Sequence, residues 1–425
     1  MDSPLKHSPP ARKEMPCRLP ARGEAPHGGR VCATLAGKMT PSIYLQVPFC
    51  QSKCTYCHFS SGVFPRELMA PYVDALCREI CEHESLLAAH LLTFPRAAAP
   101  DTIYLGGGTP SLLPPQELAR ILNAVRETFP MRHSWREVTL EADPETVTEE
   151  KAAAWKAAGI SRVSLGAQSF ADAELRASGR RHRASDVPRA VAAIRSAGIP
   201  AVNLDLILGL AGQTEESWRD SLEHLLALSP AHVSIYMFDA DEDSRLGREL
   251  LAGGARYGAG SVPDDDAQAD WFDLACARLA AAGYQHYEIS NWALPGHRAV
   301  HNSKYWQRVP YLGFGAGAHS FNASERWAST HDPVAYVQAL EDGHLLVEQR
   351  QLISPHMALE EEVFLGLRLL EGIDLARIES EYGVNLRERV PRLVEAGAVA
   401  LEGDRLRLVP ARLAVSNEVM AELLA

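Results

Sequence analysis

The chain has 425 residues, of which 46% are hydrophobic and 23% are charged, ordinary values for a globular protein of two or three domains. Its formal net charge of −12 argues against nucleic acid or an anionic membrane surface as a partner. No apolar run approaches the ~18 residues that a membrane span needs, and unpaired thiols suit a reducing compartment, so we expect a cytoplasmic protein without a membrane span.

Residues 1–40 differ in composition from the rest of the chain. They carry repeated prolines interleaved with arginine and lysine, and their apolar residues follow no regular period. Such a segment buries too little apolar surface to order itself, and it lacks the apolar stretch of a signal peptide. We therefore predict either a disordered N-terminal extension over 1–40 or a start assigned too early, with Met39 as a plausible natural start.

Short β-branched runs alternate with helical periodicity from residue 41 to about residue 260. The sequence predicts strands at 42–47, 102–106, 136–141, 162–167, 201–207 and 232–237. It predicts helices near 66–90, 115–129, 149–158, 185–197 and 215–228. Six such units predict an α/β fold, a partial (β/α)6 TIM-like barrel over 41–260. Ligands of such folds bind at the carboxyl ends of the strands, so the loops that follow the strands should hold the functional residues.

Three cysteines follow the first predicted strand with the spacing C-x3-C-x2-C: Cys50, Cys54 and Cys57. Thiolates this close can bind three of the four irons of one cluster, which leaves the fourth iron open to another ligand. A structural zinc site normally needs four ligands, usually two separated pairs. A disulfide would leave one thiol over and would require an oxidising compartment. The spacing therefore favours an open iron–sulfur cluster over both alternatives.

This loop, with Tyr56 before its last cysteine, resembles the hallmark of the radical S-adenosylmethionine superfamily. The resemblance implies a [4Fe-4S] cluster whose open iron binds the methionine end of S-adenosylmethionine. It also implies an electron donor such as flavodoxin or ferredoxin.

The loops after the later strands resemble the oxygen-independent coproporphyrinogen III oxidase lineage of that superfamily. They include the run Gly106-Gly107-Gly108-Thr109-Pro110 after the second strand and polar residues after the third to fifth strands. A glycine run lets the backbone approach a ligand closely. The resemblance implies that the contacts to S-adenosylmethionine are Tyr44, Tyr56, Gly107, Gly108, Thr109, Glu141, Gln168, Arg180 and Asp205.

Two branches of this lineage differ at the position two residues after the third cysteine. The branch of coproporphyrinogen dehydrogenases carries a fourth cysteine there, whereas the HemW-type haem chaperones usually carry phenylalanine, and this chain has Phe59. Most chaperone relatives have aspartate at the preceding position, where this chain has His58. That departure affects a neighbour of the cluster and not a ligand.

The run His301-Asn302-Ser303-Lys304-Tyr305-Trp306 resembles a haem-associated motif of the chaperone branch. An imidazole can ligate haem iron, and aromatic side chains can cover the macrocycle. The alternative is a histidine hydrogen-bonded in an aromatic core. We predict a haem-associated, barrel-closing region over 261–345, with His301 as the candidate haem contact.

Residues 346–425 combine helical periodicity with a hairpin signal around Glu402-Gly403-Asp404. This pattern predicts a helical, winged-helix-like C-terminal domain. Its arginines are interleaved with glutamates, which disfavours DNA binding, and we expect it to cap the mouth of the barrel.

These features lead to two hypotheses about function. In the first, the protein is a haem chaperone that binds haem, a [4Fe-4S] cluster and S-adenosylmethionine and passes haem to an acceptor protein that the sequence does not name. In the second, it is an oxygen-independent coproporphyrinogen III dehydrogenase, which decarboxylates two propionates oxidatively. Phe59 and the motif that starts at His301 favour the first hypothesis.

Overall fold

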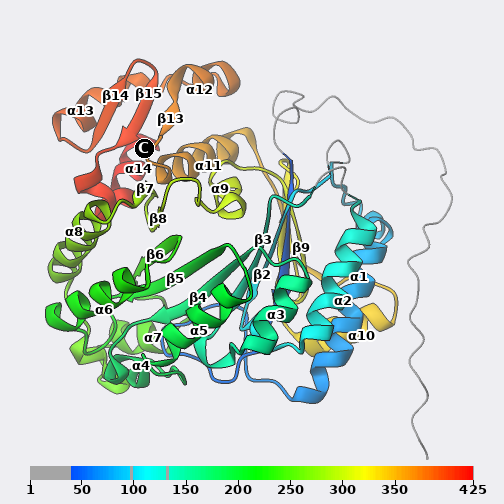
Figure 1. Cartoon of the computed structure of the whole chain (residues 1–425). Helices are drawn as coiled ribbons and strands as arrows, with labels where there is room; N and C mark the ends of the chain where they lie inside the picture. Colours follow the sequence, from blue (N-terminus) through cyan, green and yellow to red (C-terminus); the bar gives the residue numbers. More distant parts are fainter. Residues whose placement is uncertain (1–39, 96–98, 131–133, 425) are drawn as a thin grey trace, which may run out of the picture.

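Six parallel strands form the centre of a twelve-stranded sheet (Figure 1). The computed structural model describes residues 40–95, 99–130 and 134–424, so residues 1–39 of the predicted N-terminal extension lie outside the described residues. The parallel strands are β1 (Ser42–Val47), β2 (Thr102–Gly107), β3 (Glu137–Ala142), β4 (Arg162–Gln168), β5 (Ala201–Leu208) and β6 (His232–Met237). They pair in chain order, which confirms the predicted partial barrel and its strand positions.

Helices cover the outer side of this curved sheet (Figure 1). They are α1 (Met69–Ala89), α2 (Pro115–Thr128), α3 (Glu149–Ala157), α4 (Asp172–Ala177), α5 (Asp186–Ser196) and α6 (Glu215–Leu228). The Thr214 side chain caps α6 by accepting from the backbone N–H of Ser217. Just after α3 and α5 come Gly159 and Gly198, whose φ angles of +87° and +76° suit glycine and end both helices.

The period of two along each strand separates an apolar face from a polar one. In β1, Ile43, Leu45 and Val47 are fully buried in the core between the sheet and the helices. The alternate residues Tyr44 and Gln46 belong to the opposite, inner face. Polar side chains line the inner face, including Thr139, Glu141, Ser164, Asn203, Asp205 and Ser234. The barrel interior is therefore polar enough to receive a charged ligand.

Residues beyond 260 extend the sheet at both of its edges. On the β6 side, β8 (Asn291–Ala293) and β7 (Gln285–Glu288) add antiparallel strands after the long helix α8 (Asp265–Ala281). On the β1 side, β9 (Tyr311–Phe314) pairs parallel with β1. Antiparallel strands β10 (His319–Phe321), β11 (Glu325–Ser329) and β12 (Val347–Leu352) follow it. Helix α10 (Pro333–Glu341) connects β11 to β12.

The C-terminal domain begins with α11 (Pro355–Arg368) and contains a three-stranded antiparallel sheet. Its strands are β13 (Ile373–Asp374), β14 (Val399–Glu402) and β15 (Arg405–Leu408), and its further helices are α12 (Leu375–Tyr382), α13 (Val390–Glu395) and α14 (Ser416–Leu424). The arrangement fits the predicted winged-helix-like domain.

The expectation that this domain caps the barrel mouth was wrong. It packs through α11 on α9 (Val300–Trp306), which lies at the amino-terminal ends of the parallel strands. There the backbone N–H of Val300 donates to Glu137, the first residue of β3, at 3.0 Å. Figure 1 accordingly shows the C-terminal domain at the top, whereas the loop that follows β1 lies at the bottom. The carboxyl ends of the strands are thus left open to other segments.

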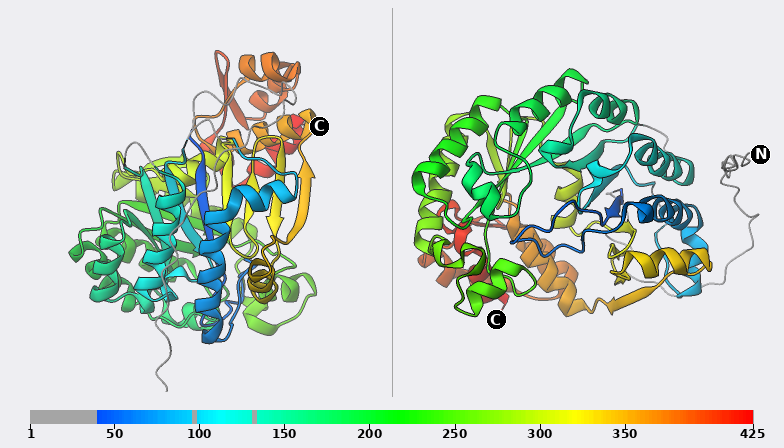
Figure 2. Two further views of the ribbon diagram at one scale, coloured as in Figure 1. Left: turned by 90° about the vertical axis from the view of Figure 1, so that its right-hand side faces the viewer. Right: turned by 90° about the horizontal axis from the view of Figure 1, so that it is seen from below.

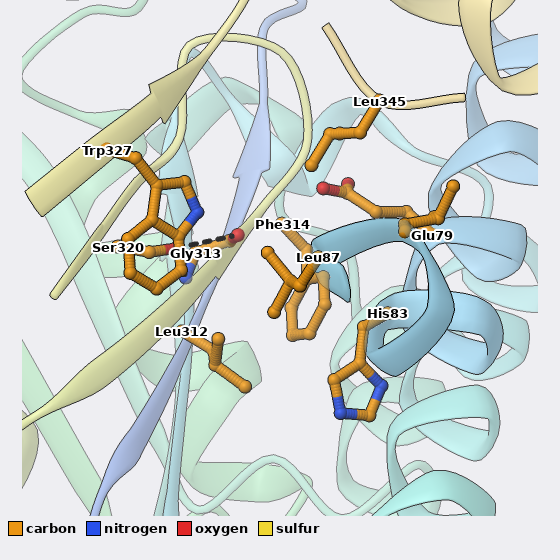
Figure 3. A pocket seen from close by; sticks show the side chains of 10 residues that line it. Glu79, His83, Leu87, Leu312, Gly313, Phe314, Ser320, Trp327 and Leu345 are labelled. Atoms are coloured by element: carbon orange, nitrogen blue, oxygen red, sulfur yellow. Dashed lines mark hydrogen bonds between the residues drawn. The ribbon is translucent and has the colours of Figure 1, made fainter. Parts of the chain in front are cut away.

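A buried carboxyl group joins α1 to the strands added beside β1. The Tyr336 hydroxyl and the backbone N–H of Gly315 donate to Glu79 Oε2 at 2.5 Å and 2.8 Å. Glu79 lines a cavity of about 10 Å³. Figure 3 shows its side chain there together with Phe314 and Leu345. Burial raises the pKa of Glu79 from 4.5 to about 7.

In the part of the chain that the structure describes, no helix is both long enough and apolar enough to cross a membrane.

Candidate functional site

The cysteine loop follows β1 and crosses the open end of the barrel, as the right-hand view of Figure 2 shows. Main-chain hydrogen bonds fix it there. The N–H of Cys50 donates to the carbonyl of Gly62 at 2.8 Å, and the N–H of Thr55 donates to the carbonyl of Ser178, after α4, at 3.0 Å. The Ser52 hydroxyl donates to the carbonyl of Gly179 at 3.2 Å.

A second segment holds the loop from the β6 side. Helix α7 (Arg245–Leu251) begins at Ser244, whose hydroxyl accepts from the N–H of Gly247 at 2.9 Å. At this helix start the N–H of Leu246 donates to the carbonyl of Thr55 at 2.8 Å, and the Arg245 guanidinium donates to the carbonyl of Lys53. No local sequence pattern marks Arg245 as a site residue, because only the tertiary fold brings it to the cysteine loop.

All three loop cysteines are free and partly buried. Burial is the main reason that the pKa of Cys50 is raised, and the neighbouring Cys57 adds to that rise. A Cβ added to Gly108 would lie 3.0 Å from Cys50 Sγ and 2.7 Å from the carbonyl oxygen of Phe49. Glycine is therefore required where the β2 loop passes the cysteine loop.

Among the described residues, no three histidine, cysteine or acidic side chains converge on a point where they could hold a single metal ion. In an iron–sulfur cube each cysteine binds a different iron. Three thiols on one short loop can therefore bind three irons of one cube, as their spacing in the sequence predicts.

A polar chain links the cysteines to the loops after β2 and β3. The Thr109 hydroxyl lies 3.9 Å from Cys50 Sγ and 3.3 Å from Asp143 Oδ2. Arg180 forms an ion pair with Asp143, donates to the carbonyl of Gly166 at 2.9 Å and lies 3.8 Å from Cys54 Sγ. Asp143 thus connects two of the predicted S-adenosylmethionine contacts, although it is absent from the set predicted from sequence. Its position directly after the third strand was the available signal.

Glu141 lies at the end of β3 and faces the β2 loop. Tyr104 donates to its Oε1 at 2.7 Å, and the N–H of Gly107 donates to its Oε2 at 3.1 Å. Burial is the main reason that the pKa of Glu141 rises to about 7. Gly107 has a φ of +109°, and a Cβ there would lie 2.4 Å from the Gln46 amide nitrogen, so only glycine fits.

The remaining predicted contacts are spread over the inner face. The Tyr44 hydroxyl donates to Gln46 at 2.7 Å, and Gln168 adopts a φ of +65° at the irregular end of β4. The Tyr56 hydroxyl is buried without a hydrogen-bond partner among the described residues. Asp205 accepts from Ser164 at 2.9 Å and from Asn203 at 2.6 Å.

The structure therefore gathers Tyr56, Gly108, Thr109 and Arg180 around the cysteines and joins Gly107 to Glu141. Asp205 is held by other partners on β4 and β5. The buried Arg180 Nε and Tyr56 hydroxyl have no hydrogen-bond partner among the described residues, so polar groups are available at this site to hold a charged ligand.

His301 lies at the other end of the barrel, on α9. Its ring is fully buried, with Nδ1 at 3.1 Å from the hydroxyl of Thr102 and Nε2 at 2.9 Å from that of Tyr305. Burial, with Lys304 nearby, lowers its pKa to about 3. Because both ring nitrogens are engaged, this geometry matches the core-histidine alternative, and haem contact by His301 stays a prediction.

Comparison with known proteins places this geometry in a family. Residues 44–225 match the radical SAM superfamily, and residues 353–411 match the HemN C-terminal domain. A Mycobacterium tuberculosis protein named "Heme chaperone HemW" is 35% identical over 382 residues, which are 90% of this chain and 94% of that protein. The Bacillus subtilis protein of the same name is 29% identical over 389 residues, with 90% and 99% of the two chains covered. The chain belongs to the HemW family of the radical S-adenosylmethionine superfamily.

This membership confirms the [4Fe-4S] cluster and S-adenosylmethionine as cofactors of this HemW-family chain. The solved structure of Escherichia coli coproporphyrinogen III oxidase (HemN), a radical SAM enzyme, is similar with a TM-score of 0.76, and the match covers 92% of this chain and 90% of that one. At 20% identity this likeness shows the shared fold alone.

Truncating Arg180 or Asp205 to alanine is expected to weaken S-adenosylmethionine binding by roughly 1–3 kcal/mol, the cost of losing a polar partner in a buried site. Arg180→Ala should have the larger effect, because it also leaves Asp143 without its ion-pair partner. Equilibrium binding to the reconstituted HemW-family protein measures the change. Arg219→Ala, which removes an exposed pair on α6, is the matched control. If both variants keep an intact cluster and an unchanged affinity, these residues do not contact S-adenosylmethionine.

Proposed function

We propose that this protein is a haem chaperone, which binds haem in addition to its [4Fe-4S] cluster and S-adenosylmethionine and delivers the haem to an acceptor protein. The observation that carries the proposal is Phe59 in the cysteine loop, where the dehydrogenase branch has a further cysteine. Its side chain is 61% exposed and has no ionisable or redox-active group. The relatives named as haem chaperones, matched over most of the chain, support the same reading.

Oxidative decarboxylation is the second candidate, since HemN shares the fold. That likeness does not distinguish the two functions, whereas the residue at position 59 does. We further propose that the protein acts in the cytoplasm and receives electrons from a donor such as flavodoxin or ferredoxin.

Reconstituted protein is expected to bind about one haem per chain and to leave coproporphyrinogen III unchanged. Anaerobic reconstitution should be followed by two assays on the same preparation, one of haem retention by absorbance and one of protoporphyrinogen IX formation. Phe59→Cys is the informative variant, because it introduces the cysteine that the dehydrogenase branch carries at this position. Sustained conversion of coproporphyrinogen III by the wild type would overturn the proposal in favour of the enzyme.

The same assay tests His301. His301→Ala weakens haem binding if the imidazole ligates iron. If its role is structural, as the two hydrogen bonds indicate, the variant keeps its haem affinity and loses stability instead, because Thr102 and Tyr305 are left without their partner.

A further inference from the structure

Three large apolar side chains are exposed on segments close to the cysteine loop. Phe59 and Val63, on the loop and just after it, are 61% and 63% exposed. Val334, at the start of α10, is 57% exposed. His331, three residues before Val334, is exposed as well. We call these four residues the histidine face.

The two segments that carry the histidine face touch each other at Ser60 and His331. His331 Nδ1 lies 2.9 Å from the hydroxyl of Ser60, the residue after Phe59. The loop between β9 and β10 joins them, since the N–H of Gly317 donates to the carbonyl of Thr330 at 2.7 Å. In the right-hand view of Figure 2 the blue cysteine loop and the yellow segments lie on the side of the barrel that faces the viewer.

Gly317 permits this close approach. Its φ is +77°, and a Cβ there would lie 2.5 Å from Ser60 Oγ and 3.0 Å from His331 Nδ1. A larger residue would push the serine and the imidazole apart. The contact between Ser60 and His331 therefore requires glycine at position 317.

The hydrogen bond prepares the imidazole of His331 for a metal. A ligating histidine usually donates its other ring N–H to a neighbouring oxygen, which fixes the tautomer and the ring orientation. When Nδ1–H donates to Ser60, the lone pair of Nε2 is available, and no described residue forms a hydrogen bond with Nε2. His301 lacks this arrangement, because both of its nitrogens are engaged in a buried network.

We propose that the histidine face binds haem, with His331 Nε2 as the axial ligand of the iron and Phe59, Val63 and Val334 against the macrocycle; this inference rests on the proposed chaperone function. The occupant must combine a metal that imidazole ligates with an apolar body, and haem combines both. The ammonium group of Lys53 would pair with the haem propionates. It lies at this surface, because Lys53 Nζ is 2.7 Å from the carbonyl oxygen of Phe59 and 3.0 Å from that of Ser61. Haem then lies beside the cysteine loop, at the opposite end of the barrel from His301.

The test titrates hemin into the full-length reconstituted protein and its variants and follows the Soret band. His331→Ala is expected to lower the affinity at least tenfold and to lose the spectrum of an imidazole-ligated iron. Added imidazole should restore that spectrum. Phe59→Ser should lower the affinity several-fold while keeping the ligation spectrum, because it removes apolar contact and leaves the ligand. His356→Ala removes another exposed histidine, on α11, and serves as the matched control for hemin that adheres nonspecifically.

The outcomes separate this inference from the function on which it rests. A wild type that binds no hemin contradicts the proposed function itself. If the wild type binds hemin and His331→Ala equals it in affinity and spectrum, only the assignment of the haem site to the histidine face is overturned. Circular dichroism checks that both variants are folded. If His301→Ala then loses hemin binding and His331→Ala keeps it, the haem site lies at the other end of the barrel.

Discussion

Replacing Cys54 by alanine is expected to yield a folded protein without its iron–sulfur cluster. The brown absorbance and most of the bound iron should disappear after anaerobic reconstitution, because only the loop of Cys50, Cys54 and Cys57 has the spacing to share one cube. The fold should survive, since the loop is fixed by main-chain hydrogen bonds such as those of Thr55 with Ser178 and Leu246.

Iron content, absorbance and circular dichroism of the variant measure this result. Cys276→Ala is the matched control, because Cys276 is a free and partly buried thiol on α8, outside the cysteine loop. A Cys54→Ala protein with its full complement of iron would show that the cluster is held elsewhere.

A second large effect is expected on the pH dependence of stability at Glu79. Its carboxyl group is charged above about pH 4.5 in the unfolded chain but only above about pH 7 in the folded protein. Between these values the unfolded chain releases a proton that the folded protein keeps, so the free energy of unfolding falls as pH rises. A shift of this size amounts to about 3 kcal/mol at most. The stabilisation is complete below pH 4.5 and lost above pH 7.

Glu79→Gln removes this titration and keeps an oxygen that can accept from Tyr336 and Gly315. The difference in free energy of unfolding between the variant and the wild type should therefore shift by about 3 kcal/mol in favour of the variant from pH 4.5 to pH 8. Urea denaturation at several pH values measures it, with Glu82→Gln, exposed on the same helix, as the control. The comparison with wild type is necessary because Glu141 also has a pKa of about 7. A constant difference across this range would contradict the assignment.

The local pattern of the sequence was sufficient to predict the barrel. The predicted strand 232–237 has the bounds observed for β6, and the predicted helix 215–228 has those of α6, because period, caps and glycines act within a few residues. Pairing between distant segments was not predictable in this way. Nothing in the short run 311–314 indicates that it lies parallel to β1, and the interleaved charges of the C-terminal domain do not indicate which end of the barrel it covers.

The same limit applies to the site. Residues at or just after the carboxyl ends of strands, such as Glu141 and Thr109, were predicted as contacts from the family resemblance, and their positions agree with the rule that ligands bind at those ends. Arg245 and His331 were missed, since each reaches the cysteine loop through a contact between segments more than 180 positions apart in sequence. His301 stood out in the sequence for its aromatic neighbours, and one of them, Tyr305, helps to hold it in a hydrogen-bonded core together with Thr102.

The anchoring of the cysteine loop has a consequence for repair. An exposed iron–sulfur cluster is vulnerable to oxygen, and its loss from a loop that depended on the metal would unfold the segment. Here carbonyls and N–H groups from the ends of α4 and α7 hold the loop independently of its sulfurs. The damaged protein therefore presents three thiols already in place, and a new cluster can be inserted without refolding of the barrel.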